Sequence, residues 1–72
     1  MNNQDQITKI THQYLDGMMP GSKVNYLDLL FYVKKESGYT GAHQTIDAMI
    51  HGVVQSRNDF MVMRGRGICK RA

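Results

Sequence analysis

The last fifteen residues, NDFMVMRGRGICKRA, constrain the fold more than any other stretch of the chain. Their apolar residues follow one another directly instead of recurring at helical spacing, which favours short strands. Gly65 and Arg66 fit the centre of a type II′ turn, because Gly65 can adopt the positive φ that this turn requires. We therefore expect a β-hairpin formed by residues 60–63 and 68–71, with Arg66 at its tip and Arg64 beside it.

Two helical segments precede this hairpin. Apolar residues recur at three- and four-residue spacing in residues 5–18 and in residues 26–37, which predicts two amphipathic helices. Asn25 is a favourable N-cap for the second helix, because its side chain can accept a hydrogen bond from a free backbone N–H. Gly38 can end the same helix in the left-handed conformation. Residues 21–24 form a short connector that can be extended.

A third helix is predicted over residues 40–54, with Thr40 as its candidate cap. Only Tyr39 and Thr40 separate it from Gly38, and so short a turn between two helices is typical of a helix-turn-helix unit. The chain, residues 1–72, is too short for a second domain. We therefore expect one α+β domain in which three helices are followed by a C-terminal hairpin.

Positive charge is concentrated at the C-terminal end. Residues 1–56 contain four basic and five acidic side chains, whereas residues 57–72 contain five basic and one acidic. The net charge of +3 therefore comes from the hairpin region. Such a cluster favours contact with phosphate groups or with an acidic protein surface, although arginines at a hairpin tip also serve solubility alone.

Other function classes find little support in the sequence. A single cysteine, Cys69, excludes an intrachain disulfide, and we expect it to be a partly buried apolar residue. The longest apolar stretch is too short to cross a membrane and the first residues lack a signal-peptide pattern, so we expect a cytoplasmic protein. His43 and His51 lie about two helical turns, roughly 12 Å, apart, so we expect no metal site. The sequence contains no glycine-rich phosphate loop and no pair of carboxylates that would indicate an enzyme, so we expect neither catalysis nor a cofactor.

The order of these elements, with the turn SGYTGAHQTI and the hairpin FMVMRGRGICKR, resembles the winged helix-turn-helix superfamily. The resemblance covers nearly the whole chain. It implies a winged-helix fold that binds double-stranded DNA, as a transcription regulator or a recombination accessory protein. It also implies that the third helix enters the major groove while the hairpin, or wing, contacts the backbone or the minor groove. The short length is typical of a phage or mobile-element protein.

Carried over residue by residue, the resemblance divides the predicted DNA contacts into two groups. No Lys or Arg lies between Glu36 and Ser56, and Asp47 would face a polyanion, so we expect the wing to make the main electrostatic contact. The candidate base-reading residues are Thr40, His43, Gln44 and Thr45. The candidate backbone contacts are Arg64, Arg66, Lys70, Arg71, Lys34 and Lys35.

A second interpretation stays open because of the first hairpin strand. Met61 and Met63 alternate with Phe60 and Val62, so both faces of this strand are apolar. Either the strand is sandwiched, or one face contacts a partner. The alternative function is a protein-interaction module, such as a phage or mobile-element protein that modulates a host protein. Homodimer formation is compatible with both interpretations.

Overall fold

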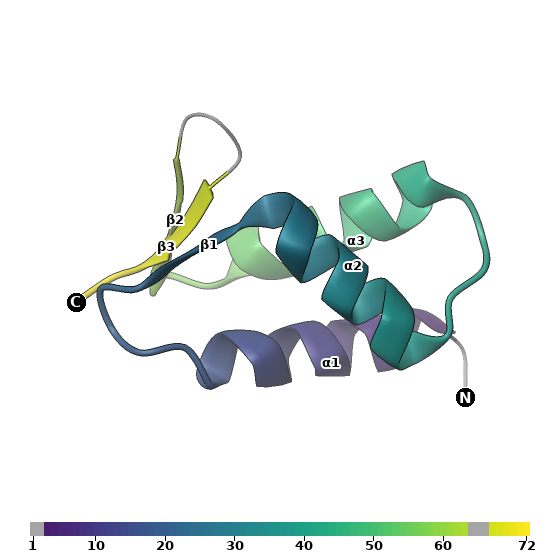
Figure 1. The fold of residues 1–72 in the computed structure, drawn as a ribbon, viewed down its shortest axis with the longest axis horizontal. Coiled ribbons are helices and arrows are strands. Elements are labelled where there is room, and N and C mark those ends of the chain that lie inside the picture. The colour runs from purple at the N-terminus through teal and green to yellow at the C-terminus, as the bar shows by residue number, and fades with distance from the viewer. Residues whose placement is uncertain (1–2, 64–66) are drawn as a thin grey trace.

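The computed structural model describes residues 3–63 and 67–72, which form three helices and a three-stranded sheet (Figure 1). The predicted α+β class is confirmed. Figure 1 shows α1 along the lower side of the molecule, α2 crossing in front of α3, and the sheet at the left. In chain order the elements are α1 (Asn3–Asp16), β1 (Lys23–Asn25), α2 (Tyr26–Ser37), α3 (His43–Ser56), β2 (Phe60–Met63) and β3 (Gly67–Lys70).

The sheet corrects the prediction of a lone C-terminal hairpin. Its strand order is β1-β3-β2, so β3 lies in the middle and pairs antiparallel with both neighbours. Ile68 stands opposite Val24 on one side and opposite Val62 on the other. The three residues of β1 are too few to show a strand pattern of their own, and they become a strand because β3 supplies the hydrogen-bonding partner. The predicted turn at Gly65 and Arg66 lies outside the described residues.

Local capping sets both ends of α2, as predicted. The side chain of Asn25 accepts a hydrogen bond from the backbone N–H of Leu27 at 2.9 Å. Gly38 has φ of 69° and donates its N–H to the carbonyl of Lys34 at 3.1 Å. A residue with a side chain would be strained in this left-handed conformation, so the helix ends where glycine permits it.

The start of α3 differs from the prediction. The helix begins at His43, its N-cap is Ala42, and no side chain caps it, so the prediction that Thr40 caps this helix was wrong. Tyr39 packs partly buried against the core, and a Cβ on Gly41 would lie only 2.6 Å from Cζ of its ring. The backbone is extended at Ala42 (φ −63°, ψ 137°), so the helix starts only at His43 and Thr40 stays exposed ahead of it.

One hydrophobic core joins the helices to the sheet. Helix α1 lies against both α2 and α3, and the sheet adds Phe60 and Ile68. Thr11, in the middle of α1, is fully buried but satisfied, because its hydroxyl donates to the carbonyl of Ile7 at 2.7 Å. None of the helices in residues 3–63 and 67–72 combines the length and the apolar character that crossing a bilayer requires. The buried apolar residues are Ile7, Leu15, Tyr26, Leu29, Leu30, Val33, Ile46, Ile50, Val53, Val54, Phe60 and Ile68.

Candidate functional site

The predicted base-reading residues gather at the start of α3. His43, Gln44 and Thr45 are exposed in its first turn, and Thr40 is exposed in the loop before it. The structure therefore brings these four residues to one end of the helix. Of the basic residues proposed as backbone contacts, those that the structure describes lie outside α3: Lys34, Lys35, Lys70 and Arg71.

Further along α3, a recess opens between the helix and β2. It encloses about 200 Å³ and is lined by Tyr26, Asp47, His51, Val62 and Met63. The Tyr26 ring stacks on His51 with 4.6 Å between the ring centroids. The Tyr26 hydroxyl donates a hydrogen bond of 2.8 Å to the backbone carbonyl of Asp47. These two contacts fix α3 to the start of α2, so the wall of the recess is preformed.

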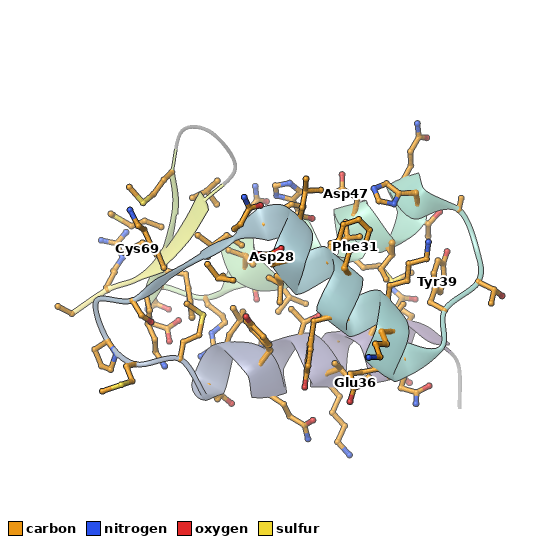
Figure 2. The ribbon with its side chains drawn as sticks, in the orientation of Figure 1. Asp28, Phe31, Glu36, Tyr39, Asp47 and Cys69 are labelled. Atoms are coloured by element: carbon orange, nitrogen blue, oxygen red, sulfur yellow. The ribbon has the colours of Figure 1, made fainter. Side chains whose placement is uncertain are left out.

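The recess has one acidic and one apolar side. Asp47 is half-buried, and its carboxylate has no hydrogen-bond or ion-pair partner among the described residues. Figure 2 shows Asp47 on the upper side of the molecule, where Phe31 of α2 also lies. Phe31 is 58% exposed, so this side combines a free carboxylate with apolar surface.

Strand β2 is the most exposed apolar element of the sheet. It occupies an edge, and after the buried Phe60 its residues Met61, Val62 and Met63 are 43%, 53% and 41% exposed. The sequence left open whether this strand is sandwiched or meets a partner. Among the described residues nothing covers it, so its apolar side chains remain available for contact.

Lys70, predicted to contact the DNA backbone, makes contacts within the chain. Its ammonium group donates hydrogen bonds to the backbone carbonyls of Met18 at 2.8 Å, Leu15 at 3.2 Å and Asp16 at 3.5 Å. These carbonyls lie at the C-terminal end of α1, which has no basic residue in its own last turn. In this position the charge of Lys70 compensates the negative end of α1, and its contact with DNA stays a prediction.

Arg57 is likewise engaged within the chain. Its guanidinium binds Asp59 through two hydrogen bonds of 2.9 and 3.0 Å, Asp16 at 2.7 Å, and Nδ1 of His12 at 3.0 Å. The hydrogen bond with Asp59 is the main cause that raises the pKa of Arg57 above its usual value, and it lowers the pKa of Asp59. Two of the five basic residues in the C-terminal region therefore hold the fold together.

Among the other predicted backbone contacts that the structure describes, Lys34 and Lys35 lie on a different element from Arg71. Arg71 has an exposed side chain beyond the end of β3. Lys34 and Lys35 lie near the end of α2, about 12 Å along the helix from Tyr26 and hence from the recess. Arg64 and Arg66 lie outside the described residues.

Comparison with known protein families, with curated proteins and with solved structures found no match. Within residues 3–63 and 67–72, no three His, Cys, Asp or Glu side chains converge on a point where they could hold a metal ion.

The sequence analysis did not find the recess. The spacing of Asp47 and His51, four residues apart on one face of α3, was a usable signal. No sequence pattern indicated that Tyr26 contributes to the recess, because this residue comes from a different helix, 21 positions before Asp47.

Proposed function

We propose that the chain is a small DNA-binding protein of the winged-helix type, acting in the cytoplasm as a transcription regulator or recombination accessory protein. The observation that supports this best concerns α3. Its first turn exposes polar side chains, and the β2–β3 hairpin is the next element in the chain after the helix ends. Because β3 also pairs with β1, the hairpin is joined to the rest of the sheet along its β3 side. In Figure 1 the hairpin and α3 reach the upper side of the molecule, opposite α1.

In this proposal the two parts of the interface have different tasks. Gln44 can form a bidentate pair with adenine, and His43 and Thr45 can donate to bases or phosphates. Arg64 and Arg66 would contact phosphates or enter a narrow minor groove. Lys34, Lys35 and Arg71 would add exposed charge around the site, whereas Lys70 is removed from the interface because α1 uses its ammonium group.

The test is a titration with a random DNA duplex at several salt concentrations. The logarithm of affinity should fall with the logarithm of salt by about 0.9 for each phosphate contact. The double variant Arg64→Ala/Arg66→Ala should lower this slope by about two units. Lys9→Ala, which removes an exposed charge from α1, is the control and should change it little. Absence of binding at low salt would contradict the proposal.

A second candidate function is recognition of a protein partner. The specific observation behind it is the exposed apolar edge strand β2 beside Asp47, whose carboxylate is unpaired within the described part of the chain. The Asp47 carboxylate would repel the phosphates of DNA, whereas a surface that is both apolar and acidic suits contact with a protein. Capture of the same protein from a lysate with and without nuclease, together with no DNA binding at low salt, would support it over the first candidate.

A further inference from the structure

We infer that β2 and the recess beside it form one binding site for an extended segment of a protein partner that carries an arginine or lysine. The segment pairs with the free edge of β2, and its basic side chain enters the recess to meet Asp47. This inference rests on the second candidate function, recognition of a protein.

The first support is the unprotected edge of β2. The strand order β1-β3-β2 leaves one side of β2 without a neighbouring strand in the described part of the chain. Edge strands are normally protected by a charged side chain, a proline or a bulge. Phe60–Met63 contains no charge and no proline, and its register with β3 runs without a bulge. Such an edge is suited to accept the backbone hydrogen bonds of an added strand.

The second support is the chemistry of the recess. The Asp47 carboxylate supplies negative charge in a half-buried position, where it attracts a cation more strongly than in open water. Val62 gives the recess an apolar wall that suits the methylene groups of a long basic side chain. The recess therefore matches a cation on an aliphatic stem, and the charge of Asp47 selects against an acidic side chain or a phosphate.

The alternation of side chains connects the edge with the recess. Phe60 is buried against the core, so Val62, two residues later, points to the same helix-facing side of the sheet. Side chains directly opposite one another on paired strands also point to the same side. A residue of the added segment opposite Val62 therefore points toward α3, where Asp47 and His51 line the recess.

A second copy of the chain is a poorer occupant. The four residues of β2 include no basic side chain, so pairing of β2 with β2 of another copy brings no cation to Asp47 from within that strand. A protein segment with a basic residue between apolar ones satisfies both the edge and the recess.

The experiment uses a short acetylated peptide that alternates valine and threonine and carries one central arginine. A matched peptide with citrulline keeps the shape of the side chain without its charge. We expect the full chain to bind the arginine peptide about tenfold more tightly, as a charge-assisted hydrogen bond permits. Asp47→Asn should abolish that difference, whereas Asp28→Asn, which removes an exposed carboxylate from α2, should preserve it. Amide hydrogen exchange of Phe60–Met63 should slow when the peptide binds.

Three outcomes would overturn the inference. Equal affinity for both peptides would exclude a cation site, and unchanged discrimination in Asp47→Asn would place that site elsewhere. Absence of peptide binding, with sedimentation showing a dimer whose β2 amides are already protected, would assign the edge to a second copy. Failure of the peptide leaves the DNA titration unaffected, because that titration depends on Arg64 and Arg66, so the two failures can be told apart.

Discussion

The two ends of α3 face differently composed regions of the molecule. Near its C-terminal end lies the Arg57–Lys70 network, in which Arg57 and Lys70 bind Asp16, Asp59 and the last carbonyls of α1. Closer to its start lies the recess, where Asp47 has no partner among the described residues and β2 exposes apolar side chains. The comparison shows that charge counts do not locate a binding site. The charges of Arg57 and Lys70 are bound within the chain and stabilise the fold, whereas the carboxylate of Asp47 remains available to a partner.

Replacing Lys70 should have the largest effect on stability. Lys70→Met removes the ammonium group from three carbonyls at the end of α1, and we expect a loss of about 2 kcal/mol of unfolding free energy. Chemical denaturation measures it, with Lys9→Met on the exposed side of α1 as the control. If the two variants are equally stable, Lys70 is not part of the network that holds the fold.

Tyr26→Phe should have the next largest effect. It removes the hydroxyl that donates to the carbonyl of Asp47 and leaves this part-buried acceptor without that donor, at a cost of about 1 kcal/mol. Tyr32→Phe, at a half-exposed position, is the matched control and should change the midpoint of thermal unfolding little. Equal midpoints would show that the wall of the recess is not held by this bond.

A smaller effect is expected from acid, because the Asp59 side chain in its pair with Arg57 is 42% exposed. The folded state lowers the pKa of Asp59 below its ordinary value of 3.8, so the stabilisation is present above that pH. It is lost as the pH falls through the lower pKa of the folded state. Asp59→Asn should therefore lose less stability between neutral and strongly acidic pH than the original chain. A steeper acid loss in the variant would contradict this assignment.

Asp47→Asn should change stability least, by less than about 0.5 kcal/mol, because its carboxylate has no partner to lose among residues 3–63 and 67–72. Asp16→Asn, which weakens a 2.7 Å ion pair with Arg57, is the comparison across the two regions and should cost more. Thermal unfolding of both variants under one condition measures the difference. A larger loss for Asp47→Asn would mean that the recess is a structural element and not a binding site.

Local interactions explain where prediction from sequence succeeded. The bounds of α2 follow from Asn25 and Gly38, which act within four residues of the helix ends. The strand Phe60–Met63 follows from its uninterrupted apolar residues. The prediction of Thr40 as a cap was wrong because it relied on residue type alone, whereas α3 begins at His43, after an extended Ala42 that provides no side-chain cap.

The sequence by itself determined the α+β class, three helices in order, two strands near the C-terminus and an excess of positive charge at that end. Only the tertiary structure decided that β1 completes the sheet, that Arg57 and Lys70 are engaged internally, and that Asp47 faces an open recess. Lys70 meets the end of α1 across 52 to 55 positions of sequence, and Arg57 meets Asp16 across 41. A local pattern cannot encode such contacts, because they form only after the core has brought the ends of these elements together.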